Sequence, residues 1–410
     1  MYKVKSYKIF FLVFYSYILL GKVLLILSSM TIENGAYISE QGVTGYPNGS
    51  TFYAIAWSIL SIAACYFFFK KACKKTKLID TNTPKTKINK IPYAIVTSIA
   101  SAWLLANIII GIKFGFPLLG GVDRFFFWQS IPGILKTFYG QVFILSAILG
   151  VIYAKSKKNL ARNLFIGTLL IQILFGSKFS GLLFSTSLFL FFYYSCSDAK
   201  IKIKKFILPA LIAAATVASI VIFQYAFVYD HGVDGAFDEV LNRFALQAHL
   251  FWGSVNLYGT SEYPKLQIFV QNLTSMYSES PEFSGMRQLM LLVSGNLAYT
   301  RIEQGADYTM AYPGIILISS GWFGVIAFEI FLSAYLAIIA VTAAHCYNKG
   351  YYIAAIPFTK LLIDIIGFYG LGNLEDILGP KPFLYVITGL ISLFIYEQFK
   401  KRRSQTQYVR

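Results

Sequence analysis

The sequence predicts an all-α polytopic membrane protein of about ten transmembrane helices. Of its 410 residues, 56% are hydrophobic and only 13% are charged, whereas a soluble domain carries roughly 25% charged residues. Several apolar runs approach or exceed the ~20 residues that cross a bilayer core. Lys and Arg cluster beside these runs, and the ten-residue alternation typical of barrel strands is not present.

The expected spans follow the apolar runs, and each basic cluster marks the end of one span or pair of spans. The first run follows Lys8 and lacks a small-residue cleavage site, so we expect an uncleaved helix. The second precedes the segment 70–90, which holds eight lysines. The spans are 9–30, 51–69, 92–113, 131–154, two that share 163–196, 206–229, 311–346, 351–371 and 382–398.

The charge distribution orients these spans. With the N-terminus in the cytoplasm, alternate loops hold 25 of the 36 Lys and Arg residues, and the opposite loops hold seven of them and 14 of the 19 acidic residues. This is the positive-inside pattern, with both termini cytoplasmic. The net charge of +17 is therefore explained by topology, and we expect no nucleic-acid partner.

Two segments have lengths that do not match whole membrane spans. Residues 163–196 are too few for two full spans, so we expect two short helices that turn at 176–181 and place Lys178 below the headgroups. Residues 311–346 are too many for one span. A half-helix from Pro313, broken near 321–324, fits them, because non-helical backbone at membrane depth is tolerated beside a cavity.

Residues 230–310 form a large polar loop within what is otherwise a single integral membrane domain, 1–410. Apolar residues recur in this loop at helical spacing, which predicts amphipathic helices in the interface plane. One helix is marked by Phe237, Val240, Leu241, Phe244, Leu246 and Leu250, and another by Met286, Leu289, Met290 and Val293.

The cations on the acidic side of the membrane form the first candidate site. Arginine suits phosphate because its planar fork binds two oxygens at once, and a lysine in a short apolar turn is costly without a purpose. Each arginine can equally be a solvated or locally paired loop cation, as we expect for Lys265 and Lys381. The candidates for a pyrophosphate are Arg124, Lys178, Arg243, Arg287 and Arg301.

The acidic candidates are Glu303 and Asp307, which lie four residues apart and so share a face of any helix. Either can act as general base for a hydroxyl nucleophile, with Asp307 and Tyr308 orienting a sugar. Alternatively, the two carboxylates form an acidic first turn that favours the dipole of the next helix. Lys360 and Asp364 are expected to form an i,i+4 ion pair inside a span, which can also mark an ion path.

The sequence contains no motif typical of a metal site, a redox site, a hydrolase or an ATPase. The three histidines and four cysteines have no metal-ligand or CxxC spacing, and no GxSxG or Walker A motif is present. We therefore expect no metal and no cofactor. Aromatic groups such as Phe125–Trp128 and Phe251–Trp252 suit either an interfacial belt or stacking on sugar rings.

The chain resembles the Wzy-type O-antigen polymerases (oligosaccharide repeat-unit polymerases). The resemblance covers nearly the whole chain at the level of architecture, with many spans and one large loop in the second half. It is carried by Arg124 after a Gly-rich turn, Gly176-Ser177-Lys178 between short helices, Arg243-Phe244-Ala245-Leu246-Gln247, and Tyr312-Pro313-Gly314 leading to Gly321.

The resemblance implies a GT-C-like glycosyltransferase of the bacterial inner membrane that faces the periplasm. It would join undecaprenyl-pyrophosphate-linked repeat units without a metal ion, within lipopolysaccharide or other surface polysaccharide biosynthesis. Its partners would be a lipid-linked donor and acceptor, with or without a chain-length regulator. The implied roles are catalysis for Glu303, Asp307 and Arg243, and pyrophosphate or substrate binding for Arg124, Lys178, Arg287, Arg301, Gln247 and Tyr308.

Two other functions stay open at this point. An O-antigen ligase is a relative, but ligase-like chains typically carry a His just before the half-helix, where this sequence has Asp307-Tyr308-Thr309-Met310. A polysaccharide flippase belongs to a different class. Flippases usually have more spans, lack so large an outer loop and carry cations within the bundle.

Overall fold

The computed structural model describes residues 6–75, 90–120, 124–177, 179–197, 244–275, 285–303, 308 and 310–408, with six single positions between 219 and 242. These residues are almost wholly helical, apart from a short antiparallel hairpin of β1 (Tyr37–Ile38) and β2 (Val43–Thr44). The expected span 206–229 falls almost wholly outside the described residues.

Helices long and apolar enough to cross a membrane confirm an α-helical polytopic membrane protein. The described residues contain seven of them, and two shorter apolar helices lie between the fourth and the fifth. Each of these nine helices coincides with an expected span, with ends that differ by several residues. The seven are Tyr15–Glu33, Ser50–Lys75, Pro92–Phe114, Gly133–Ser156, Gly314–Lys349, Tyr352–Leu371 and Glu375–Gln398.

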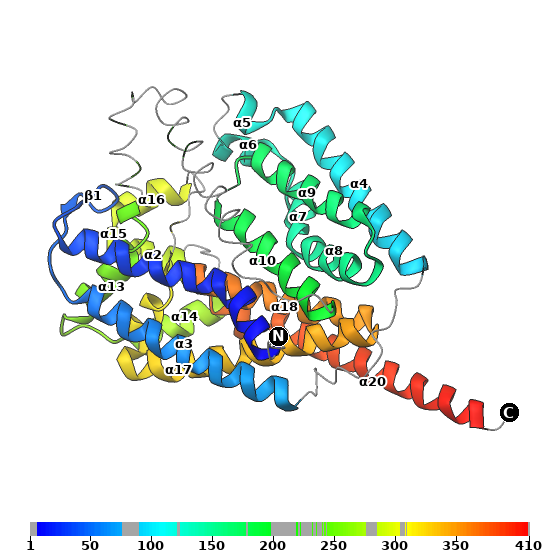
Figure 1. The fold of residues 1–410 in the computed structure, drawn as a ribbon. Helices are drawn as coiled ribbons and strands as arrows, with labels where there is room; N and C mark the ends of the chain where they lie inside the picture. The colour runs from blue at the N-terminus through cyan, green and yellow to red at the C-terminus, as the bar shows by residue number, and fades with distance from the viewer. Residues whose placement is uncertain are drawn as a thin grey trace, which may run out of the picture.

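One group of helices surrounds the larger hydrophobic core. It contains α2 (Tyr15–Glu33), α3 (Ser50–Lys75), α17 (Gly314–Lys349), α18 (Tyr352–Leu371) and α20 (Pro380–Tyr408). Helix α17 packs along both α3 and α18, and α18 packs on α20. The chain enters α2 through the short α1 (Ser6–Ile9) and a π-helical segment, Phe10–Phe14. Figure 1 shows α2, α3 and α17 side by side.

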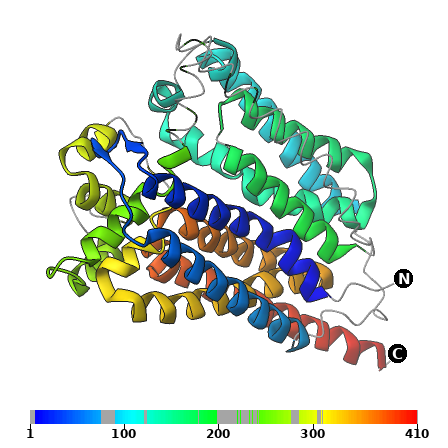
Figure 2. The ribbon, with the colours of Figure 1, turned by 60° about the vertical axis from the view of Figure 1, so that its left-hand side comes forward.

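A second group has its own core and stacks above the first in both ribbon views (Figure 2). It contains α4 (Lys90–Phe114), α7 (Gly133–Gly140), α8 (Val142–Ser156), α9 (Asn159–Leu174) and α10 (Phe179–Cys196). Helices α9 and α10 have 16 and 18 residues, which confirms the expected pair of short helices. Between α4 and α7 lie α5 (Pro117–Gly120) and α6 (Arg124–Ser130).

Helix α17 is broken where the sequence predicts a break. Gly321 has φ +70° and ψ −174°, a backbone conformation that side chains rarely adopt, so the helix divides into a half-helix (314–320) and a longer helix (322–349). The carbonyl of Ile318 in the half-helix accepts a hydrogen bond from the backbone N–H of Lys265 at 2.9 Å. Part of the freed backbone is therefore satisfied by the large loop.

The described parts of the large loop form a helical cap over the end of the bundle that carries the β-hairpin, here called the hairpin end (Figure 1). The cap consists of α13 (His249–Tyr258), α14 (Leu266–Thr274), α15 (Gly285–Ser294) and α16 (Asn296–Glu303). Helices α13, α14 and α15 pack on α17, and α15 packs on α16. The short α19 (Glu375–Leu378) follows α18 and contacts α14.

The two expected amphipathic helices have different outcomes. Helix α15 buries Met286, Leu289 and Met290, as predicted. The other was expected to run unbroken to Leu250, but residues 246–248 form a turn and α13 begins after it. That prediction is wrong in its C-terminal part, because the apolar spacing continues across the turn and does not reveal it.

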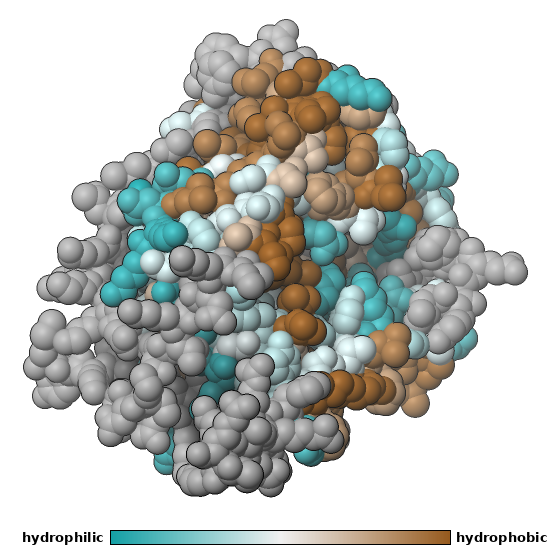
Figure 3. Space-filling view, turned by 90° about the vertical axis from the view of Figure 1, so that its right-hand side faces the viewer, coloured by the Kyte–Doolittle hydropathy of each residue, from teal (hydrophilic) through white to brown (hydrophobic). Residues whose placement is uncertain are grey.

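Apolar side chains remain exposed on the outside of the second group and on α20. They include Ile99, Leu105 and Ile112 of α4 and Phe383 and Phe394 of α20, all more than half exposed. Figure 3 shows hydrophobic side chains gathered over broad areas of one face of the molecule. Such a surface is unfavourable in water and suits lipid, which agrees with a membrane-embedded chain.

Candidate functional site

Two of the candidate residues meet on a carboxylate at the hairpin end. Arg301 donates from Nε to Glu40 Oε2 at 3.0 Å, and the hydroxyl of Tyr308 donates to the same oxygen at 2.7 Å. The ring of His249 lies edge-on to Tyr308, with centroids 4.5 Å apart. Glu40, His249, Arg301 and Tyr308 are called the hairpin-end cluster below.

Four separate elements bring this cluster together. Glu40 lies in the loop of the β-hairpin, His249 begins α13, Arg301 is in the last turn of α16, and Tyr308 precedes α17. The side chain of Arg301 is 45% exposed and that of Glu40 is 12% exposed. The cluster is thus open on the Arg301 side and covered around Glu40.

His249 and Tyr308 are held in their neutral forms. Burial lowers the pKa of His249 to about 4, its Nδ1 lies 2.7 Å from the carbonyl of Leu246, and its Nε2 has no hydrogen-bond partner among the described residues. Burial, followed by the hydrogen bond to the Glu40 carboxylate, raises the pKa of Tyr308 above its ordinary value. Tyr308 therefore remains a hydrogen-bond donor at neutral pH.

The other candidate residues are placed only in part. Gln247 lies in the turn before α13, Arg287 is half-buried on α15, and Glu303 is the exposed last residue of α16. Arg287 and Glu303 belong to the helical cap, and Gln247 directly precedes it. Lys178, Arg243 and Asp307 lie outside the described residues, as does the side chain of Arg124, the first residue of α6.

A second carboxylate, which is not among the residues predicted from the sequence, lies inside the bundle. Glu329 of α17 is fully buried. Its Oε2 accepts from Trp57 Nε1 at 2.9 Å and from the Tyr312 hydroxyl at 2.7 Å. Its Oε1 accepts from the hydroxyls of Tyr369 and Ser333, both at 3.1 Å. Four donors from α3, α17, α18 and the segment before α17 therefore satisfy one carboxylate.

A buried lysine accompanies this carboxylate. Lys22 of α2 is 2% exposed, and its Nζ has no hydrogen-bond partner among the described residues. The ammonium lies 3.2 Å from the ring centroid of Trp57, whose N–H is bonded to Glu329. The indole therefore receives the cation on its face and donates to the anion at its edge. Lys22, Trp57, Tyr312, Glu329, Ser333 and Tyr369 are called the buried network below.

The sequence did carry a signal for this network. Lys22 and Glu329 are charged residues inside apolar runs, and such residues are rare in membrane spans and usually have a function or a partner. Lys360 and Asp364 of α18 were recognised by the same argument, and their predicted ion pair is confirmed at 3.1 Å. Lys22 and Glu329 lie on different helices, so sequence spacing does not pair them.

One short segment connects the two carboxylates. Tyr308 bonds to Glu40 and, four residues later, Tyr312 bonds to Glu329. Between them Met310 has φ +60°, which is uncommon for a residue other than glycine. Its side chain packs against Gly21, where an added Cβ would lie 3.2 Å from Met310 Cε. The segment before the half-helix is therefore fixed at both ends by carboxylates.

Comparison with known proteins gives little functional information. A model of a family of unknown function, DUF6418, matches residues 279–386. This match covers α15, α16, the Tyr308–Tyr312 segment, α17, α18 and the start of α20. No curated protein matches the chain. No solved structure matches it either.

Proposed function

We propose that the protein is a surface polysaccharide polymerase that joins undecaprenyl-pyrophosphate-linked repeat units at the periplasmic face of the bacterial inner membrane. The observation that carries the proposal is the hairpin-end cluster, in which the predicted residues Arg301 and Tyr308 converge on a carboxylate of the β-hairpin loop. Such a cluster places a proton acceptor next to a cation at the end of a membrane bundle.

The proposed reaction needs both a proton acceptor and a cation. A hydroxyl of the acceptor glycan attacks the anomeric carbon of the donor, and the bond from that carbon to the pyrophosphate oxygen breaks. The hydroxyl proton passes to Glu40, which replaces Glu303 as the first candidate base because Glu40 is covered and held by two donors, whereas Glu303 is exposed. Asp307 lies outside the described residues and stays a candidate base. Arg301, with the other predicted arginines, stabilises the charge that develops on the departing pyrophosphate.

The charges at the two ends of the bundle support this orientation. Helix α3 begins at the hairpin end and finishes with Lys74 and Lys75, and α17 begins there and finishes with Lys349. By the positive-inside rule, the end with these lysines faces the cytoplasm. The hairpin end would then face the periplasm, where lipid-linked repeat units are available.

Two observations bear on the alternative functions, ligase and transporter. His249 contacts Tyr308 just before the half-helix, so a histidine occupies this region although the local sequence has none. This contact is the one observation that fits the ligase, which would use the same chemistry. Lys22 and Glu329 are buried charges within the bundle, as expected of a transporter. Transport is therefore the second candidate function.

A gel of the surface polysaccharide from a deletion strain separates these functions. Loss of a polymerase leaves a single repeat unit attached to the lipid A core, whereas loss of a ligase or flippase leaves no attached repeat. We expect the single unit in the deletion strain and in Glu40→Gln and Arg301→Ala.

The matched control is Glu397→Gln, which removes another carboxylate that accepts from a tyrosine, Tyr351, at 3.0 Å. This control should restore long chains. A deletion strain with no attached repeat would contradict the polymerase proposal.

A further inference from the structure

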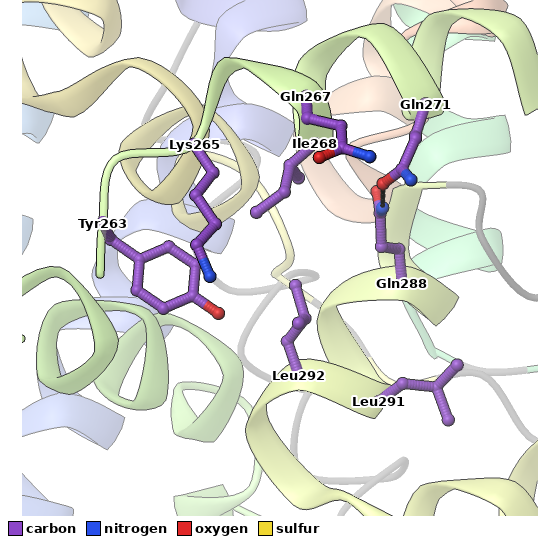
Figure 4. A pocket seen from close by; sticks show the side chains of 8 residues that line it. All are labelled: Tyr263, Lys265, Gln267, Ile268, Gln271, Gln288, Leu291 and Leu292. Atoms are coloured by element: carbon purple, nitrogen blue, oxygen red, sulfur yellow. Dashed lines mark hydrogen bonds between the residues drawn. The ribbon is translucent and has the colours of Figure 1, made fainter.

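A pocket of about 230 Å³ opens in the helical cap, away from the hairpin-end cluster. It lies between the segment that leads into α14, α14 itself and α15 (Figure 4). Its lining combines carboxamide, aromatic, cationic and aliphatic side chains. These are Tyr263, Lys265, Gln267, Ile268, Gln271, Gln288, Leu291 and Leu292.

The polar wall of the pocket contains an unsatisfied acceptor. Gln288 is 4% exposed, and its Nε2 donates to Gln271 Oε1 at 2.8 Å. Its Oε1 has no hydrogen-bond partner among the described residues. A buried acceptor without a donor costs free energy, which a ligand hydroxyl would recover once the carboxamide of Gln288 turns toward the pocket that this residue lines.

The charge balance of the pocket disfavours phosphate. Its cation, Lys265, lies 3.2 Å from the carboxylate of Glu262, so the two charges offset each other. Phosphate and pyrophosphate are usually held by several cations, often by arginine forks. The Lys265 ammonium also lies 4.8 Å from the ring centroid of Tyr263. The pocket therefore presents one aromatic ring, hydrogen-bonding amides and little net charge.

The apolar wall and the size indicate a small ring with both polar and apolar faces. Ile268 is buried, and Leu291 and Leu292 are half-buried beside it. The volume equals that of about seven or eight waters at roughly 30 Å³ each. It lies below the roughly 300–1,000 Å³ of pockets for drug-sized ligands. A single pyranose ring has hydroxyls for the amides and a C–H face for the aliphatic and aromatic side chains.

We propose that this pocket is a subsite for one neutral pyranose of the glycan substrate, with Gln288 Oε1 accepting from a sugar hydroxyl. The subsite rests on the proposed function, because its ligand would be the glycan on which the hairpin-end cluster acts. The pocket and the cluster share a support: Lys265 N–H bonds to Ile318 of the half-helix, and α15 packs on α16, which carries Arg301.

The test measures binding of the free repeat-unit oligosaccharide, released from the strain's own surface polysaccharide, to the purified full chain in detergent. Gln288→Met keeps the length of the side chain and removes the acceptor, and it should weaken binding about tenfold, the effect of one hydrogen bond. Tyr263→Leu should also weaken binding, whereas Tyr263→Phe, which keeps the ring, should not. Gln141→Met, on an exposed glutamine before α8, is the matched control and should bind normally.

The outcomes separate this inference from the proposed function. Equal binding by wild type, Gln288→Met and Tyr263→Leu overturns the subsite, and so does displacement of the oligosaccharide by inorganic pyrophosphate that depends on Lys265. Either result leaves the polymerase proposal intact if the deletion strain still shows a single capped unit. Conversely, if the deletion strain shows normal chains but Gln288→Met loses oligosaccharide binding, the sugar subsite stands and the polymerase proposal fails.

Discussion

The buried network and the hairpin-end cluster each contain a carboxylate that accepts hydrogen bonds from tyrosine. They differ in the number of donors to that carboxylate and in the exposure of the side chains. Glu329 accepts from four donors and is fully buried, with Lys22 behind the Trp57 ring. Glu40 accepts from Tyr308 and from Arg301, which is almost half exposed. A saturated carboxylate in a closed bundle has no lone pair to spare for a substrate, whereas one beside an exposed cation can take part in a reaction.

From this difference we infer that the buried network stabilises the fold and that the hairpin-end cluster carries out the reaction. A buried charge is tolerated only when hydrogen bonds and an opposite charge compensate the loss of water. The buried network meets this condition by joining α2, α3, α17, α18 and the segment before the half-helix. It therefore fixes the position of Tyr312, and through the same segment that of Tyr308.

Removal of the buried carboxylate should have the largest effect. Glu329→Ala leaves Lys22 without a nearby anion and leaves Trp57, Tyr312 and Tyr369 without their acceptor, at a cost of about 3–5 kcal/mol. We expect little folded protein in the membrane, measured by size-exclusion chromatography in detergent and by thermal unfolding.

Lys22→Met in the Glu329→Ala background should recover part of this loss, because neither charge is then buried. Glu329→Ala protein with wild-type thermal stability would contradict the structural role of the network.

Removal of the hairpin-end carboxylate should impair the reaction and spare the fold. Glu40→Gln keeps the size of the side chain but cannot take a proton, and it should lower the initial polymerisation rate by about 10²–10⁴-fold, the usual contribution of a general base. Glu303→Gln, at an exposed position, should have a smaller effect. The rates are measured with purified protein in lipid vesicles. If Glu303→Gln were the slower variant, Glu303 would regain the role of base.

Acid should destabilise the hairpin end through His249. Its pKa is about 4 in the folded protein and 6.5 ordinarily, so between these values the unfolded chain binds more protons than the folded chain. Stability is therefore complete above pH 6.5 and falls as the pH falls toward 4, by about 3 kcal/mol for a shift of this size. The melting temperature at pH 7.5 and at pH 4.5 measures the effect.

His249→Gln should lose less stability than wild type over that pH interval. His345→Gln, which changes a histidine near the end of α17 remote from the hairpin, is the comparison variant and should respond to pH as wild type does. An identical pH response in His249→Gln and wild type would exclude His249 as the source.

The smallest expected effect concerns the indole between the two buried charges. Trp57→Phe removes the donor to Glu329 but keeps an aromatic face under Lys22, so it should cost about 1.5–3 kcal/mol, the value of a hydrogen bond to a charged group. Thermal unfolding measures this loss. No measurable loss would mean that the ring face, which Phe keeps, and not the N–H, is the main contribution of Trp57.

The helices were predicted well because each one can be recognised from the hydropathy of its own residues. The seven long spans, the short α9 and α10, and the break at Gly321 all follow from run length and from glycine. The turn at 246–248 did not, because apolar spacing continued across it. The count of ten spans depends on residues 206–229, which lie almost wholly outside the described residues.

The candidate site was predicted less completely. Arg301 was identified as a cation on the acidic side of the membrane, and Tyr308 as a neighbour of the acidic pair Glu303 and Asp307. Glu40 lies about 260 residues away in the chain, and a local pattern carries no information about such a contact. Lys22 and Glu329 were visible as charges in apolar runs, but their pairing through Trp57 depends on how three helices pack.

The central claim is that the hairpin-end cluster catalyses glycan transfer from a lipid pyrophosphate. The direct measurement is release of undecaprenyl pyrophosphate by the purified protein in vesicles loaded with undecaprenyl-pyrophosphate-linked repeat units. Wild type and Glu397→Gln should release one undecaprenyl pyrophosphate for each new glycosidic bond. Folded Glu40→Gln should release almost none in the same time. Equal release by Glu40→Gln and wild type, or movement of intact lipid-linked units across the bilayer without release, would contradict the claim.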